Sequence, residues 1–207
     1  MRRTKEEAQK TKEEIYRAGL AVFAENGFAA ATMQDVAKRA GVTRGAIYWH
    51  YRTKQAFYEE TVSRLTSAYE EIILQVRQAD SVLDGITAAI QRLVHRFLND
   101  SEFRAMQELT MRESDHRSDA ARRNQESFER ASDDAVEIVR AGIERGEICS
   151  EFSPAVVSLT VQAFIGGLFL TMTEDGVTVS DEELAEAAMI FRRALEPRTI
   201  RRRKNDA

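Results

Sequence analysis

A short run of residues near the N-terminus carries side chains that can hydrogen-bond to nucleic acid. Arg44 can donate two parallel hydrogen bonds to the O6 and N7 atoms of guanine, and Thr43 can contact a thymine methyl group or a phosphate. Gly45 has no side chain, so its backbone can approach a groove closely. These residue types predict recognition of base edges rather than covalent catalysis.

Further polar and aromatic residues follow within ten positions. Tyr48, His50 and Lys54 are predicted to contact phosphates, which position a protein on a duplex without reading its sequence. His50 also fits an ordinary exposed histidine, but its place beside Trp49 and near Lys54 favours a phosphate contact. Trp49 itself is predicted to pack against protein rather than to stack on a base.

Two short helices joined by a tight turn would position these groups. Counted from Met33, the fifth residue is Ala37, the ninth is Gly41 and the fifteenth is Ile47. Two helices that cross steeply need a small side chain at their approach, a turn residue that tolerates positive φ, and an apolar residue directed into the core. The spacing therefore predicts a helix-turn-helix, although an unrelated helical hairpin could share it. Ile47 and Tyr51, four positions apart, are predicted to point inward. The residues then turned outward near the N-terminal end of the second helix are Thr43, Arg44, Gly45 and Tyr48.

The distribution of charge agrees with a nucleic-acid partner. The whole chain of 207 residues has a net charge of −4, which by itself argues against DNA binding. Residues 1–54 nevertheless hold eleven Lys and Arg against six Asp and Glu, whereas residues 55–207 hold 19 against 28. A basic head on an acidic body is expected if only the head meets phosphates. The acidic body also argues against a purely architectural DNA-coating protein.

Enzyme, metal and cofactor chemistry find no support in the sequence. It contains no glycine-rich phosphate loop, nucleophile elbow or H-E-x-x-H motif. Cys149 is the only cysteine, His95 lies on a charged face and His116 lies in a polar joint, so no clustered ligand set for a metal is predicted. We expect no catalytic residues, no metal and no cofactor.

Apolar periodicity and capping residues predict an all-α chain. The predicted caps at helix starts are Thr32, Thr43, Thr53, Ser153 before Pro154, and Ser180 with Glu183. With only two prolines, long helices are favoured. Residues 155–172 are the most apolar stretch but include Ser158, Thr160 and Gln162, which indicates a buried helix rather than a membrane span. The basic start lacks an apolar segment behind it, so we expect a cytoplasmic protein. The first predicted helix starts near Lys10 and ends at the stop signal Asn26-Gly27. The other predicted helices span about 33–40, 44–51, 54–77, 81–98, 102–113, a long segment from the joint 114–118 to Gly146, 154–173 and 181–195, before a frayed tail at 198–207.

The run ATMQDVAKRAGVTRGAIYWHYRTKQAFY, residues 31–58, resembles the DNA-binding signature of the TetR family of bacterial regulators. The element Y-W-H-Y/F-x-x-K is highly specific to that family. The start RRTKEEAQKT further resembles the branch that represses multidrug efflux pumps. By motif position, the resemblance implies contacts with double-stranded operator DNA from Thr32, Gln34, Thr43, Arg44, Gly45, Tyr48, His50 and Lys54.

The resemblance also implies two domains and a homodimer. Residues 1–56 would form a three-helix DNA-binding domain of the helix-turn-helix type, and residues 57–207 a larger helical domain for ligand binding and dimerisation. The last two helices would pack against their copies, because the helix from Pro154 is very apolar and Gly166-Gly167 permits close approach. The stripe on the last helix could instead be buried inside one subunit; its residues are Leu184, Ala188 and Phe191.

A small hydrophobic effector is the expected regulatory ligand. The candidate pocket has apolar walls with one polar amide, although each of these residues could equally belong to the core. Where the efflux branch often carries Lys-Cys-Glu, this chain has Met111-Arg112-Glu113, which leaves the ligand class open. The resemblance favours a repressor of an efflux operon; the alternative is a regulator of metabolic genes that senses a fatty acyl or similar metabolite. The candidate ligand-binding residues are Phe97, Phe103, Met106, Gln107, Met111, Phe128 and Phe164.

Overall fold

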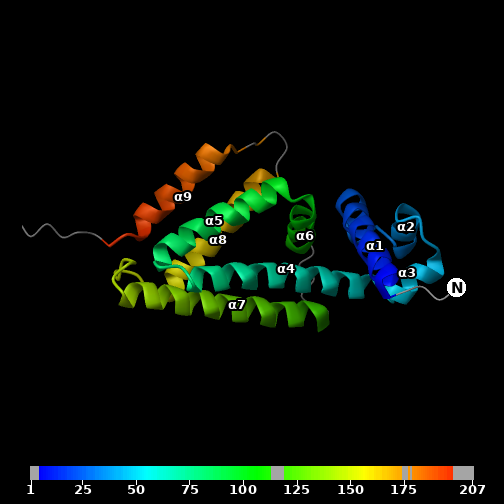
Figure 1. Ribbon diagram of the computed structural model, residues 1–207, viewed down its shortest axis with the longest axis horizontal. Helices are drawn as coiled ribbons and strands as arrows, with labels where there is room; N and C mark the ends of the chain where they lie inside the picture. Colours follow the sequence, from blue (N-terminus) through cyan, green and yellow to red (C-terminus); the bar gives the residue numbers. More distant parts are fainter. Residues whose placement is uncertain (1–4, 113–118, 174–176, 178, 198–207) are drawn as a thin grey trace, which may run out of the picture. The chain divides into compact units, whose positions relative to one another are not determined.

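The computed structural model describes residues 5–112, 119–173, 177 and 179–197, without the side chains of 119–129 and 131 (Figure 1). In this part of the chain all regular structure is α-helical, which confirms the predicted fold class. The joint 114–118 with His116, the side chain of Phe128 and the tail 198–207 lie outside the described residues. The helices are α1 (Lys5–Asn26), α2 (Met33–Arg39), α3 (Arg44–His50), α4 (Lys54–Arg77), α5 (Val82–Asn99), α6 (Ser101–Arg112), α7 (Asp119–Glu144), α8 (Pro154–Met172) and α9 (Asp181–Leu195).

Side-chain caps begin several of these helices where the sequence predicted them. The hydroxyl of Thr53 accepts a hydrogen bond from the amide of Ala56 at 3.0 Å, and Ser153 begins α8 with Pro154 directly after it. Ser180 and Glu183 form a complete capping box at the start of α9. The helix boundaries are therefore encoded locally.

The first helix differs most from its prediction. It begins at Lys5, five residues before the predicted start at Lys10, and it ends at Asn26, where the Asn26-Gly27 signal predicted its end. Apolar periodicity could not detect residues 5–9 because they are mostly polar and exposed. Glu6 and Glu7 lie in the first turn, where negative charge is favoured by the helix dipole. At the other end, Gly27 takes the positive φ of 75° that ends the helix.

The chain separates into two compact units, and the boundary cuts through helices rather than through a linker. The first unit contains residues 1–69 and 96–129, and the second contains residues 70–95 and 130–207. The first unit thus groups α1–α3 with α6 and the N-terminal part of α4. The predicted domain boundary after residue 56 stays a prediction, because compactness does not test where a domain functions or folds alone.

The core of the first unit is built on Phe57 of α4. Its ring lies 5.2 Å from Tyr16, 5.0 Å from Phe23 and 5.2 Å from Tyr51, measured between ring centroids. All four side chains are buried. Gly19 makes room for this cluster, since a Cβ atom there would lie 2.4 Å from Phe57 Cε2. The aromatic cluster fixes α1 and the end of α3 on the first turns of α4.

The core of the second unit is mainly aliphatic and includes the predicted stripe of α9. Ala188 is fully buried and Phe191 stacks on Phe164 with centroids 4.9 Å apart. The backbone amide of Cys149 donates to the carbonyl of Leu195 at 2.8 Å, which ties the connector after α7 to the end of α9. The stripe is therefore used inside one chain, as the alternative interpretation of these residues held; its buried members are Leu184, Ala188, Phe191 and Leu195.

The apolar helix α8 is largely exposed, so the prediction of a buried helix is wrong for the single chain. Leu159 is 65% exposed, and the helix is long and apolar enough to cross a membrane by length and composition alone. Its other large exposed side chains include Val156 and Leu170. Interface helices of soluble proteins have the same composition, because they bury this surface only in an assembly. Among the described residues, the other elements leave these side chains of α8 exposed.

Candidate nucleic-acid interface

The first half of the helix-turn-helix is fixed by a capping box at Thr32. The amide of Asp35 donates to the Thr32 hydroxyl at 3.2 Å, and the amide of Thr32 donates to the Asp35 carboxylate at 2.9 Å. The hydrogen bonds from the hydroxyl and amide of Thr32 lower the pKa of the Asp35 carboxyl below its usual value. Gln34 is exposed on the first turn of α2. Both predicted contact residues of α2 therefore lie at its accessible N-terminal end.

The turn and the inward face have the geometry that the spacing predicted. Gly41 has a positive φ of 66°, and the amide of Val42 donates to the carbonyl of Ala37 at 3.0 Å. Ala37 is buried and Ile47 is fully buried, so the small residue and the apolar residue occupy their expected places. The amide of Ala46 donates to the Thr43 hydroxyl at 3.2 Å, which caps α3. All three steric requirements of the motif are confirmed.

The outward face of α3 presents a cation and several polar or aromatic groups. Arg44, Gly45 and Tyr48 are exposed, and the Arg44 guanidinium lies 5.6 Å from the centroid of the Tyr48 ring. A Cβ atom on Gly45 would meet only the Thr43 hydroxyl, at 3.9 Å. The helix therefore has a side on which neither side chains nor backbone are covered by the rest of the unit, and a groove could receive it.

Trp49 belongs to this exposed face, so the prediction that it packs against protein is wrong. It is 72% exposed and contacts the ring of His50 edge-on, with centroids 4.5 Å apart. The phase of the helix explains this position, because two residues after the buried Ile47 is about 200° around an α-helix. The exposure of Trp49 could therefore have been predicted from its position relative to Ile47 on the helix, whereas its aromatic character suggested burial.

Lys54 makes its contacts inside the protein. Its ammonium group donates to the backbone carbonyls of Phe28 at 2.5 Å, Ala29 at 3.2 Å and Ala31 at 3.0 Å. It also lies 4.6 Å from the centroid of the Phe28 ring. An ammonium has three donors, and the loop between α1 and α2 engages all of them. In this geometry Lys54 orients the loop that leads into α2, and a phosphate contact from it stays a prediction.

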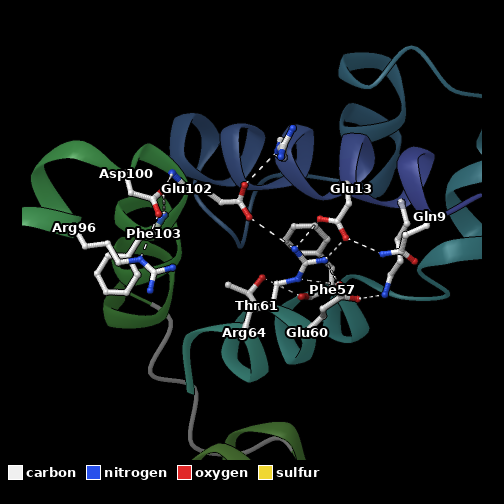
Figure 2. A network of polar contacts seen from close by, with 12 residues as sticks. Gln9, Glu13, Phe57, Glu60, Thr61, Arg64, Arg96, Asp100, Glu102 and Phe103 are labelled. Carbon is white, nitrogen blue, oxygen red and sulfur yellow. Dashed lines mark hydrogen bonds and ion pairs between the residues drawn. The ribbon is translucent and has the colours of Figure 1, made fainter. Parts of the chain in front are cut away.

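An ion-pair network holds α1 on α4 (Figure 2). The Arg64 guanidinium donates to both oxygens of the Glu13 carboxylate at 2.8 Å each and to Glu60 at 2.6 Å. The same group lies 3.8 Å from the centroid of the Tyr16 ring, and Lys12 pairs with Glu60 at 2.7 Å. Sequence reasoning missed this network, because Glu13 and Arg64 are 51 residues apart and no local pattern links them.

The network shifts the titration of its carboxyl groups. The hydrogen bonds from Arg64 lower the pKa of Glu13. Burial raises the pKa of Glu60, but hydrogen bonds from Lys12 and Arg64 outweigh burial, so the pKa of Glu60 is also lowered. Both carboxylates are therefore more stable as anions in the folded chain.

Four of the seven predicted ligand-binding residues are buried in the first unit, at the end of α5 and in α6. Phe103 is fully buried, and the ring of Tyr69 lies 6.4 Å from it. Burial raises the pKa of Tyr69, and a hydrogen bond with Gln107 opposes this shift. Met111 is 40% exposed and does not share this environment, while Phe164 belongs to the second unit. The four buried residues are Phe97, Phe103, Met106 and Gln107.

Comparison with known proteins identifies relatives along most of the chain. Residues 15–61 match the family model for bacterial regulatory proteins of the tetR family. The transcriptional repressor BepR of Brucella suis biovar 1 is 30% identical over 172 residues, which cover 81% of this chain and 82% of BepR. The transcriptional regulator TtgR of Pseudomonas putida is 27% identical over 173 residues, with coverage of 81% and 82%.

A solved structure with the same fold is that of NalD, described as the secondary repressor of the MexAB-OprM multidrug efflux pump in Pseudomonas aeruginosa. It superposes with a TM-score of 0.75 at 22% identity, over 93% of this chain and 98% of NalD. The arrangement of helices, and not only the motif of residues 31–58, is therefore shared with such regulators.

Proposed function

Since this chain belongs to the TetR family of bacterial regulatory proteins, we propose that it represses a multidrug efflux operon and leaves its operator when a small apolar ligand binds. Regulators of this family bind operator DNA and dimerise, and they are generally not enzymes. The observation that carries the proposal is the uncovered outward face of α3, on a helix whose opposite side is buried through Ile47. The N-terminal resemblance to efflux repressors and the likeness to NalD support the choice of target.

In the proposed complex, α3 enters the major groove with its N-terminal end. Arg44 reads a guanine, and Gly45 allows the backbone to come close. Trp49 joins the contact set because it is exposed beside Tyr48, where its indole N–H can donate to a phosphate. The remaining proposed contacts are Thr32, Gln34, Thr43, His50 and Lys54.

The proposed dimer uses the exposed apolar face of α8 and α9. On α9, Ile190 is 71% exposed and Met189 is 48% exposed, and neither belongs to the buried stripe. A Cβ atom on Gly166 or Gly167 would meet nothing within 4 Å, so the middle of α8 has room for another helix to approach closely. A two-fold assembly through this face fits an operator of two half-sites.

Release of DNA is proposed to proceed through α4. This single helix runs from Lys54, which holds the loop before α2, to Arg77, and it crosses from the first compact unit into the second. The two recognition helices of a dimer must match half-sites about 34–36 Å apart, so a ligand that shifts α4 changes the spacing. A 100-fold loss of DNA affinity would need about 2.7 kcal/mol of coupling between ligand and DNA.

The function is tested by selecting DNA sequences with the purified protein and measuring affinities for the selected site and its single-base variants. Arg44→Ala should lose about 1–3 kcal/mol of binding and its preference at one position, because the guanine contact is removed. Lys54→Ala should weaken binding to every sequence and lower the melting temperature, because the loop before α2 is released.

Arg140→Ala serves as the control, because this arginine lies on α7 and pairs with Glu137. It should bind like the wild type. Equal losses of specific and nonspecific affinity in Arg44→Ala would refute base recognition by Arg44. A selected site that occurs beside genes of fatty acyl metabolism, and not beside a pump operon, would replace the efflux target by the metabolic alternative.

A further inference from the structure

The start of α6 is held in a defined orientation. The carboxylate of Asp100 accepts hydrogen bonds from the amides of Glu102 and Phe103, both at 3.0 Å, and so caps the helix. Arg96 pairs with Asp100 at 3.4 Å, and its guanidinium lies 4.7 Å from the centroid of the Phe103 ring. These contacts fix the first turn of α6, and with it the backbone from which Glu102 extends.

Glu102 reaches from α6 into the ion-pair network of the DNA-binding helices. Its carboxylate lies 3.7 Å from the Arg64 guanidinium and accepts a hydrogen bond from Arg17 of α1 at 3.2 Å. Figure 2 shows the carboxylates of Glu13 and Glu102 directed toward Arg64 from two different helices. One guanidinium on α4 therefore connects α1, through Glu13, with the first turn of α6.

The geometry of this network restricts the orientation of the Arg64 side chain and of the carboxylates that it contacts. Arg64 and its three carboxylate partners are each between 20% and 31% exposed, which is less than for an ordinary surface pair. Isolated surface pairs contribute little, whereas a bidentate pair in a shared network imposes an orientation as well as an attraction. The Tyr16 ring beneath the guanidinium limits its rotation further. Displacement of α6 relative to α1 would have to break the contacts of Glu102.

We propose that Arg64 is a positioning residue that clamps α1 to α6 through Glu13 and Glu102, so that operator binding by α3 and the stability of α6 are coupled. The coupling to DNA rests on the proposed function. The clamp itself rests only on the contacts within the first unit. Because linkage is reciprocal, DNA that orders the helices around α1 must also stabilise α6, and loosening of α6 must weaken DNA binding.

The test is amide hydrogen exchange on the full-length protein, free and bound to a DNA site selected in vitro. In the wild type, DNA should slow exchange in residues 101–112 by about fivefold or more, the lower end of usual allosteric couplings. Glu102→Gln keeps the shape of the side chain but removes its charge. In this variant the slowing in 101–112 should disappear, while slowing in α2 and α3 should remain, because those helices keep their own DNA contacts.

Two further variants separate the clamp from a general loss of charge. Glu108→Gln makes the same change on the same helix at a residue that forms no ion pair with the described residues, and it should behave like the wild type. Arg64→Lys keeps the positive charge but cannot form the bidentate pair, and it should reproduce the effect of Glu102→Gln. Slowing in 101–112 that is absent in the wild type, or equal in the wild type and Glu102→Gln, would overturn the proposal.

The free protein tests the clamp without DNA. Glu102→Gln should speed exchange in 101–112 and in the part of α1 around Glu13, and Glu108→Gln should not. Unchanged exchange in both segments would overturn the clamp even if operator binding is intact. A wild-type protein that selects no DNA sequence would overturn the proposed function instead, and the free-protein comparison would still decide the clamp.

Discussion

The helices of the DNA-binding motif and the last two helices expose opposite kinds of surface. The outer face of α3 carries a cation, hydroxyl groups and aromatic rings with polar edges, whereas α8 and α9 expose aliphatic side chains such as Leu159 and Ile190. A polar and charged surface suits a partner that binds through its phosphates and is later released. An apolar surface suits an association that persists. The difference between the two surfaces agrees with the proposed reversible contact of α3 with DNA and the proposed lasting dimer contact of α8 and α9.

The largest expected effect breaks the apolar interface. Leu159→Asp combined with Ile190→Asp should give a monomer that keeps its helical content, because both side chains are exposed in the single chain. Operator affinity should fall by about 100-fold or more, since a monomer loses the effective concentration that links two half-sites. Sedimentation velocity and DNA titration measure the two effects.

Leu74→Asp is the matched control, since Leu74 is an exposed leucine on α4, outside the α8–α9 face. This variant should remain a dimer. A double variant on α8 and α9 that sediments as a dimer of wild-type strength would move the interface to another surface. Phe191, which the sequence assigned to the dimer face, is unsuitable for the test because its substitution would damage the core of one chain.

A smaller effect distinguishes the two surfaces of the DNA-binding motif. A Cβ atom on Gly19 would lie 2.4 and 2.6 Å from two ring atoms of Phe57, and the surrounding aromatic rings limit how far Phe57 can shift. Gly19→Ala should therefore destabilise the fold by about 1–3 kcal/mol, the usual cost of overpacking. Denaturant unfolding measures this change.

Gly45→Ala should act in the opposite way. Its Cβ atom would meet nothing closer than 3.9 Å, and alanine favours a helix over glycine by about 1 kcal/mol, so stability should be kept or increased. Operator affinity should nevertheless fall, because the added methyl group separates the backbone from the groove. A Gly45→Ala protein with wild-type affinity would contradict the close approach of α3.

The sequence correctly predicted those structural features that depend on residues close together in the chain. The caps at Thr32, Thr43 and Ser180 and the turn at Gly41 depend on neighbours three or four positions away, and all were identified. The sequence did not predict the contacts of side chains whose partners lie far away in the chain or in another molecule. The internal contacts of Lys54 were missed, because nothing local reveals that its ammonium donates to three carbonyls of the loop before α2.

The exposed apolar side chains of α8 and α9 show the same limit of local sequence patterns in the C-terminal part of the chain. Composition identified α8 as apolar but could not say whether its own chain covers it. The stripe on α9 was visible by its period, yet the period did not reveal that it packs inside the chain and leaves Met189 and Ile190 outside. Recognition of the DNA-binding motif was more specific, since its chemistry is concentrated in 28 residues, 31–58.

The smallest expected effect concerns the acid stability of the ion-pair network on the DNA-binding side. A glutamate in an unfolded chain titrates near pH 4.3, and Arg64 holds the pKa of Glu13 lower than that in the folded chain. Between these two values the unfolded chain binds more protons, so the stabilisation from Glu13 is complete above about pH 4.3 and is lost as the pH falls through the folded value.

Glu13→Gln removes this contribution, and its free energy of unfolding should fall less steeply than that of the wild type as the pH is lowered from 5 to 3. Glu14→Gln removes the same charge from an exposed neighbour outside the network and should retain the wild-type slope. Urea unfolding at several pH values compares the three proteins, and equal slopes for wild type and Glu13→Gln would show that the pair with Arg64 does not contribute to stability.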